Sequence, residues 1–68
     1  MNAIDIGKNL IGLRNKKGIS QEKLAAKVDK SKNSIYLLEK GQIKDPGILT
    51  LQKIADVLEV PITELLKK

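Results

Sequence analysis

The chemistry open to this chain rests on its basic side chains, because the usual nucleophiles and metal ligands are missing. The sequence contains no cysteine and no histidine, so it offers no thiolate or imidazole ligand for zinc, no disulfide and no Cys nucleophile. It also has no Gly-rich phosphate loop and no evident pair of carboxylates, and 68 residues barely enclose a core. We therefore expect no enzyme activity, no bound metal and no cofactor.

The basic residues are concentrated in the first half of the chain. Residues 1–34 carry eight Lys or Arg against three Asp or Glu, whereas residues 35–68 carry five of each. The whole net charge of +5 therefore lies in the first half. A one-sided basic excess suits a polyanionic partner, although a Lys-rich surface that keeps a protein soluble gives the same pattern.

The amino-acid composition narrows the class of polyanion that the protein could bind. Tyr36 is the single aromatic residue, which argues against a single-strand binder that stacks bases on several rings and against an RNA-recognition sheet.

No uncharged stretch is long enough for a transmembrane span, and residues 1–12 lack the basic and apolar regions of a signal peptide. These features predict a soluble, cytoplasmic protein.

Apolar residues at helical spacing predict three helices in the first half. A helix at about residues 3–16 is indicated by apolar positions at i, i+4 and i+7, namely Ile6, Leu10 and Leu13. A second helix at about residues 21–28 and a third at about residues 32–39 are each preceded by a serine that can cap the first turn.

The second half adds two more helices. Apolar positions at i, i+3, i+4 and i+7 run from Leu51 to Leu58, which is the clearest amphipathic pattern in the chain. Pro61 ends this stretch and can open a last short helix from Ile62 to Leu66. No stretch alternates apolar and polar residues over strand length, so residues 1–68 are predicted to form one all-α domain of five short helices.

The second and third helices have the spacing of a helix-turn-helix. Ala25 is small where two helices must cross closely, and Ile35 and Leu38 can seat the third helix on the second. Asp29 lies in the tight turn between them, at a position that often needs a positive φ.

With these features the sequence resembles the phage-repressor (Cro-type, XRE-like) helix-turn-helix family over about residues 6–66. The segments that carry the resemblance are ISQEKLAAKV, SKNSIYLLEKG and LTLQKIADVLEVPITELL. The resemblance implies a compact, lambda-repressor-like, five-helix domain that places its third helix in the major groove of double-stranded DNA. We expect a sequence-specific transcriptional regulator, with a repressor preferred, while the sequence does not separate a repressor from an activator or an autoregulating controller. A protein-interaction or antitoxin-type module of the same fold is the alternative, and the basic first half favours DNA.

The resemblance also assigns roles to individual residues. Base reading falls on the exposed side of the third helix, at Lys32, Asn33, Tyr36 and Leu37. Phosphate contacts fall on Ser20, Gln21 and Lys44, although Ser20 serves equally well as a helix cap and Lys44 as a solvated loop residue.

Other positions that the resemblance singles out are structural. It implies a partly buried salt bridge between Arg14 and Glu39, which would fix the angle of the third helix.

The sequence departs from the family pattern at three positions. Asp29 stands where glycine is common, and Asp45 and Gly47 stand where basic residues are common. The last two departures predict a modest affinity for DNA per monomer.

A homodimer on a roughly palindromic site is expected, because one recognition helix reads only about four or five base pairs. The sequence predicts a contact through the last helix and the loop before it, with apolar residues Val60, Ile62, Leu65 and Leu66. In the alternative, Leu65 and Leu66 simply close the core of the monomer.

Overall fold

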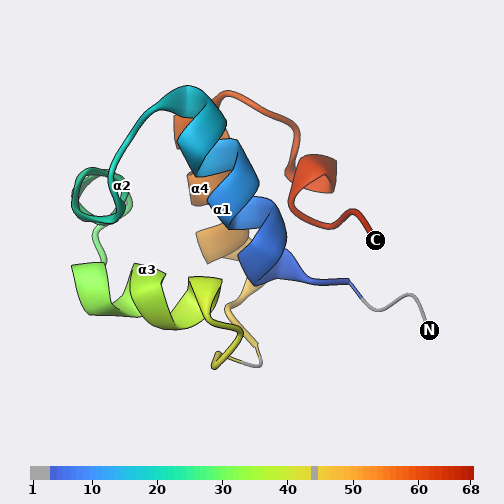
Figure 1. Cartoon of the computed structure of the whole chain (residues 1–68), viewed down its shortest axis with the longest axis horizontal. Coiled ribbons are helices and arrows are strands. Elements are labelled where there is room, and N and C mark those ends of the chain that lie inside the picture. The colour runs from blue at the N-terminus through green and yellow to red at the C-terminus, as the bar shows by residue number, and fades with distance from the viewer. Residues whose placement is uncertain (1–3, 44) are drawn as a thin grey trace.

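The structure is a computed structural model that describes residues 4–43 and 45–68. This part of the chain is all-helical and forms four α-helices and one short 3-10 helix (Figure 1). The elements are α1 (Ile6–Lys17), α2 (Gln21–Lys27), α3 (Lys32–Glu39), α4 (Ile48–Leu58) and the 3-10 helix η1 (Ile62–Glu64). None of the helices in the described ranges is both long enough and apolar enough to cross a bilayer.

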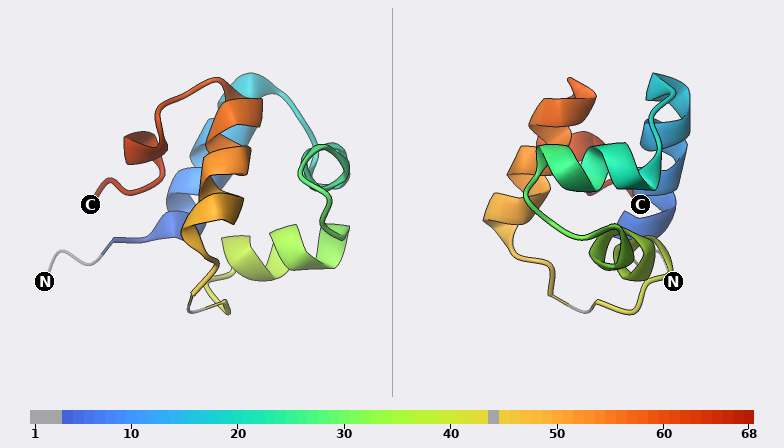
Figure 2. Two further views of the ribbon diagram at one scale, coloured as in Figure 1. Left: turned by 180° about the vertical axis from the view of Figure 1, so that it is seen from behind. Right: turned by 90° about the vertical axis from the view of Figure 1, so that its left-hand side faces the viewer.

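The helices are arranged around α1 and α4, which run in the same direction through the middle of the molecule (Figures 1 and 2). The pair α2 and α3 lies on one side of them, and the C-terminal segment with η1 lies on the other (Figure 1). Both α1 and α2 pack on α3. The recognition helix expected from the sequence is therefore held by two other helices.

The predicted fifth helix is wrong. The segment Ile62–Leu66 contains only the three-residue η1, in which every backbone bond spans three residues: Glu64 N–H to Pro61, Leu65 N–H to Ile62 and Leu66 N–H to Thr63. Five residues are too few to form a stable α-helical nucleus, so the tighter 3-10 geometry takes its place.

One predicted helix start also differs from the structure, and the start of a second helix lies before its apolar pattern. The first helix was expected from about residue 3, which lies outside the described residues, but α1 begins at Ile6, because the Asp5 carboxylate accepts a hydrogen bond from the Lys8 N–H at 2.9 Å and caps the helix. The fourth helix begins at Ile48, one turn before Leu51, directly after Gly47 with its φ of 83°. The bounds of α3 agree with the prediction.

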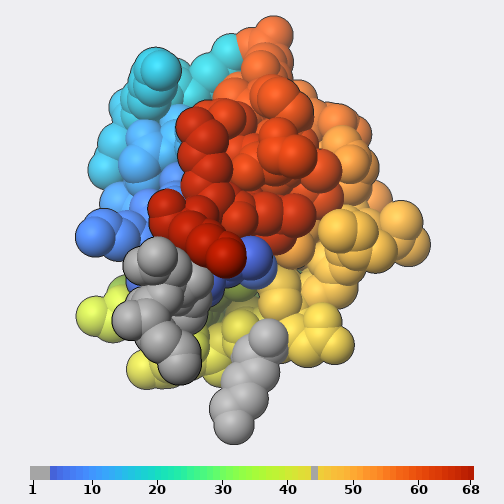
Figure 3. All heavy atoms as spheres, turned by 90° about the vertical axis from the view of Figure 1, so that its right-hand side faces the viewer, coloured from blue at the N-terminus to red at the C-terminus, as the bar shows by residue number. Residues whose placement is uncertain are grey.

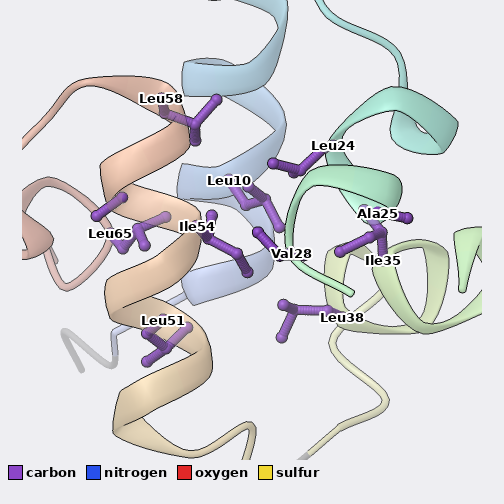
Figure 4. Packing of buried hydrophobic residues seen from close by; sticks show 11 residues of the cluster. Leu10, Leu24, Ala25, Val28, Ile35, Leu38, Leu51, Ile54, Leu58 and Leu65 are labelled. Atoms are coloured by element: carbon purple, nitrogen blue, oxygen red, sulfur yellow. The ribbon is translucent and has the colours of Figure 1, made fainter. Parts of the chain in front are cut away.

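The core is a single apolar cluster to which every α-helix contributes (Figure 4). Leu10, Leu24, Ile54 and Leu65 are fully buried. Leu65 comes from the C-terminal segment, so its burial agrees with the alternative in which it closes the core of the monomer, while Leu66 is only partly buried. The remaining members of the buried cluster are Ala25, Val28, Ile35, Leu38, Leu51, Ala55 and Leu58.

Asn9 anchors the C-terminal segment to α1. Its side-chain Nδ2 donates to the carbonyl oxygens of Leu65 and Lys67, both at 2.8 Å. These backbone groups lie beyond the last helical turn, where carbonyls have no partner in the chain's own helices. The bonds from Asn9 thus hold the C-terminal segment in place, where the sequence predicted a fifth helix.

The turn between α2 and α3 has the predicted left-handed residue. Asp29 has a φ of 57°, which confirms the expectation for this position. The Lys30 N–H then donates to the Ala25 carbonyl at 2.9 Å and closes the turn. This geometry sets the angle between the two helices of the motif.

Replacing Asp29 by glycine is expected to raise the free energy of unfolding by roughly 0.5–1 kcal/mol, because glycine adopts a positive φ without the steric cost of a Cβ. Thermal unfolding followed by circular dichroism measures the change. Asp29→Val is the matched control and should lower the melting temperature, since a β-branched residue fits this region poorly. A loss of stability in Asp29→Gly would show that the aspartate side chain itself stabilises the turn.

Candidate nucleic-acid interface

The outward side of α3 carries the four predicted base-reading residues. Ile35 and Leu38 are buried against the core, so the opposite side of the helix faces solvent. Lys32 and Asn33 are exposed, Tyr36 is 45% exposed and Leu37 is half-buried. The structure thus brings the predicted readers together on one helix and leaves Leu37 at the edge of the exposed surface.

The first turn of α3 is fixed by Ser31. Its hydroxyl oxygen accepts a hydrogen bond from the Ser34 N–H at 3.1 Å and lies 3.0 Å from the Ser34 hydroxyl. A serine in this position satisfies one of the free amides of the first turn. Lys32 and Asn33 follow directly, so both side chains project from a capped, ordered backbone.

Lys40 is a neighbour of the base-reading set that the sequence analysis did not identify. Its Nζ lies 5.9 Å from the centre of the Tyr36 ring, within the range of a cation–π contact. The spacing of four residues between Tyr36 and Lys40 on a helix was the available signal. The contact adds a positive charge to the C-terminal end of the exposed side of α3.

The start of α2 lies next to the start of α3. Ser20 and Gln21 line a depression of about 400 Å³ that also includes Arg14, Glu22 and Lys32. Two of the predicted phosphate contacts therefore share one surface with a predicted base reader. The right-hand view in Figure 2 shows α2 crossing directly above α3.

Ser20 and Gln21 have defined partners within the protein. The Ser20 hydroxyl accepts a hydrogen bond from the Lys23 N–H at 3.0 Å and so caps α2. Gln21 Nε2 donates to Glu39 Oε1 at 2.9 Å. A side-chain amide nitrogen carries two hydrogens, so Gln21 can donate a second hydrogen bond besides the one to Glu39.

Arg14 and Glu39 form an ion pair between α1 and the end of α3. Arg14 Nε lies 2.7 Å from Glu39 Oε2, and its Nη2 lies 3.2 Å from Oε1, so the contact is bidentate. Arg14 Nη1 also donates to the Ile19 carbonyl at 2.9 Å. With Gln21 on the same carboxylate, this network ties α1, α2 and α3 together behind the exposed side of α3.

The loop between α3 and α4 contributes less to the described surface. The predicted phosphate contact Lys44 lies outside the described residues. Its neighbour Asp45 is exposed, and its carboxylate accepts a hydrogen bond from the Gly47 N–H at 3.3 Å. The acidic side chain thus serves the turn that leads into α4.

Known proteins share both the sequence and this arrangement. A family model described as Helix-turn-helix matches residues 10–65. The uncharacterized HTH-type transcriptional regulator y4dJ of Sinorhizobium fredii is 35% identical over 60 residues, which cover 88% of this chain and 77% of that protein.

Solved structures of other proteins are also similar to this chain in sequence and fold. The restriction-modification controller protein C.AhdI from Aeromonas hydrophila is 31% identical with a TM-score of 0.83, over 91% of this chain and 88% of its own. SinR, a master regulator for biofilm formation solved in complex with DNA, is 32% identical with a TM-score of 0.85, over 91% and 98%. The N-terminal DNA-binding domain of SinR from Bacillus subtilis, also 32% identical, has a TM-score of 0.83 over 93% and 91%. The chain belongs to the helix-turn-helix family, of the XRE type that its sequence resembles.

Proposed function

We propose that this protein is a transcriptional regulator, acting as a repressor, that binds double-stranded DNA sequence-specifically with α3 in the major groove. The observation that carries the proposal is the exposed, capped first turn of α3 with Lys32 and Asn33 side by side. A major groove is wide enough to admit an α-helix, and each base pair presents a distinct pattern of donors and acceptors there.

The roles of the α3 side chains follow from their hydrogen-bonding groups. The Lys32 ammonium donates to guanine O6 and N7, and the Asn33 amide pairs with adenine N6 and N7. Tyr36 and Leu37 lie one turn further along the helix and add apolar contact, for which a thymine methyl group is the matching partner.

The start of α2 supplies the contacts to the DNA backbone in this proposal. The second N–H of Gln21 donates to a phosphate oxygen, while its bond to Glu39 keeps the side chain in position. Ser20 and the loop residue Lys44 complete the set. Contacts of this kind fix the register of the protein on the duplex and read no sequence themselves.

Two copies bind a roughly palindromic operator in this proposal. A two-fold dimer places the two α3 helices about 34 Å apart, which is one turn of B-DNA. Each copy then reads one half-site, and the pair gains the specificity that one short helix lacks.

Asn33→Ala is expected to relax the preference at one or two base pairs by about 1–3 kcal/mol, because the bidentate contact to one base is lost. The measurement is selection of bound duplexes from a random library, first with the natural chain and then with the variant. Lys32→Ala should relax the preference at a neighbouring base pair by a similar amount.

Gln21→Ala is the matched control, compared at a temperature where it remains folded. It should weaken binding to all sequences about equally, because a phosphate contact carries no base information. A base-selective loss for Gln21→Ala together with none for Asn33→Ala would reverse the two assignments. Selection that enriches no sequence with the natural chain would instead favour the protein-interaction module.

A further inference from the structure

A groove runs between α1 and the C-terminal segment, on the side of the molecule away from α2 and α3 (Figure 1). Its larger part is a depression of about 540 Å³. Figure 3 looks onto this face, where the C-terminal segment (red) borders α1 (blue). We call it the α1 groove, and its two walls are formed by Lys8, Gly12 and Lys16 of α1 and by Glu64, Lys67 and Lys68 of the C-terminal segment.

The α1 groove is positively charged. Four lysines line it against two carboxylates, those of Asp5 and Glu64. Lys67 Nζ lies 2.9 Å from Glu64 Oε2, so that carboxylate is already neutralised. Lys8 and Lys16 are exposed and form no ion pair within the residues that the structure describes. Their charge therefore favours a partner that carries carboxylates or phosphates.

Gly12 leaves the α1 wall open at its middle. It lies one turn from Lys8 and one turn from Lys16, on the same side of the helix. Glycine in a helix interior is about 1 kcal/mol less favourable than alanine. No internal contact offsets this cost among the described residues, because a Cβ at Gly12 would meet nothing within 4 Å. A glycine at this point allows the backbone of a partner to approach α1 closely between the two lysines.

The hydrogen-bonding groups of the α1 groove favour a peptide over a nucleic acid. Asn9 Nδ2 donates to the carbonyl oxygens of Leu65 and Lys67, which uses both of its hydrogens and leaves the amide oxygen as an acceptor. Asp5 adds a carboxylate to the same lining. A peptide carries N–H donors for these acceptors as well as carboxylates for the lysines, whereas the phosphodiester backbone of DNA carries acceptors only.

The α1 groove also offers apolar surface and a defined length. A smaller depression of about 270 Å³ shares Leu13 and Lys16 with it and reaches Val60. Leu13 and Val60 are half-buried, so they can receive an apolar side chain. The 12 residues of α1 span about 18 Å at 1.5 Å per residue, which is room for about five or six residues of extended chain.

We propose that the α1 groove binds a short acidic segment of a partner protein. Carboxylates of the segment pair with Lys8 and Lys16, its backbone crosses α1 at Gly12, and an apolar side chain contacts Leu13. The inference goes beyond the proposed function and does not depend on it. Because the α1 groove and α3 lie on opposite sides of the molecule (Figure 1), the chain can hold the segment and a duplex at the same time.

The test begins with selection of displayed random 12-residue peptides on the full natural chain. We expect enrichment of peptides that combine Asp or Glu with an apolar residue, and fluorescence anisotropy of the labelled peptide then measures its affinity. Gly12→Gln fills the α1 groove without changing the charge and should weaken binding by at least about tenfold. Asn15→Gln is the matched control, since it places the same side chain at an exposed position of α1 outside the groove, and it should leave the affinity unchanged.

A second pair of variants tests the charge. Lys16→Gln should weaken peptide binding by about twofold to fivefold, the range for an exposed ion pair. Lys27→Gln removes the same charge from α2, on the other side of the molecule, and should have no effect. Circular dichroism checks that each variant is folded. Selection that enriches no acidic peptide, or an acidic peptide that binds Gly12→Gln as tightly as the natural chain, would overturn the proposal.

Backbone amide shifts of the ¹⁵N-labelled chain separate a peptide site from a second nucleic-acid contact. The selected peptide should shift the amides of Gly12 and Lys16, and a duplex should shift that of Asn33. Displacement of the peptide from Gly12 and Lys16 by a duplex would overturn the proposal in favour of a nucleic-acid contact. A chain that binds the peptide in the α1 groove but binds no duplex would contradict the proposed function alone.

Discussion

Replacing Arg14 by methionine is expected to lower the free energy of unfolding by about 3–5 kcal/mol, because it leaves the Glu39 carboxylate buried without its cation. The side chain of Glu39 is 4% exposed and that of Arg14 is 14% exposed, so water cannot replace the lost partner. Urea unfolding followed by circular dichroism measures the change. The spectrum of the folded fraction should remain helical.

Lys16→Met is the control for the loss of one positive charge from α1. Lys16 is exposed and forms no ion pair within the described residues, so its replacement should change stability by no more than about half a kcal/mol. Adding Glu39→Met to Arg14→Met should recover part of the loss, since the buried charge is then gone. Equal small effects for Arg14→Met and Lys16→Met would show that the network does not hold α3.

Gly7→Ala is expected to cost about 3 kcal/mol, near the upper end for one methyl group inserted into a packed interior. Gly7 is buried where α1 meets the end of α3, and a Cβ there would lie 2.6 Å from the carbonyl oxygens of both Leu38 and Glu39. These are backbone atoms, so relief requires the two helices to move apart. Thermal unfolding of the variant measures the loss.

Gly12→Ala separates this contact from the general effect of alanine in a helix. Gly12 lies in the same helix, and a Cβ there meets nothing within 4 Å. Alanine is favoured over glycine in a helix interior by about 1 kcal/mol, so Gly12→Ala should raise the melting temperature. If both variants gained stability, the close approach of α1 and α3 would be wrong.

Local patterns in the sequence predicted much of the fold. Serine caps and the apolar positions Ile35 and Leu38 sufficed for the bounds of α3, and the turn position of Asp29 predicted its positive φ. The prediction of a last helix was wrong, because Ile62 and Leu66 have helical spacing but too few residues lie between them to form an α-helix.

Contacts between distant parts of the chain could not be read from such patterns. Asn9 holds the carbonyls of Leu65 and Lys67, and nothing local to Asn9 indicates a partner 56 residues away. In the sequence Gly7 is an ordinary glycine within a helix, and its contact with α3 is evident only in the folded structure. The burial of Leu65 and the exposure of Leu49 likewise depend on how the helices pack.

The candidate site was predicted through a family resemblance, and the structure adds how its residues are held. The exposed positions of Lys32 and Asn33 follow from the buried positions of α3. The bond from Gln21 to Glu39 was not foreseen, since a phosphate contact was the role implied for Gln21. The contact of Lys40 with Tyr36 was not predicted, since Lys40 lies one turn beyond the residues that the resemblance assigns.

The most direct test of sequence-specific DNA binding is a titration of the natural chain with two duplexes of equal length at low and moderate salt. One duplex carries the site obtained by selection, and the other carries the same base pairs in scrambled order. We predict a preference of about 10³-fold or more for the selected site, with affinity that falls steeply as salt rises because lysines replace condensed cations. Equal affinity for the two duplexes, or affinity that stays flat with salt, would contradict the account.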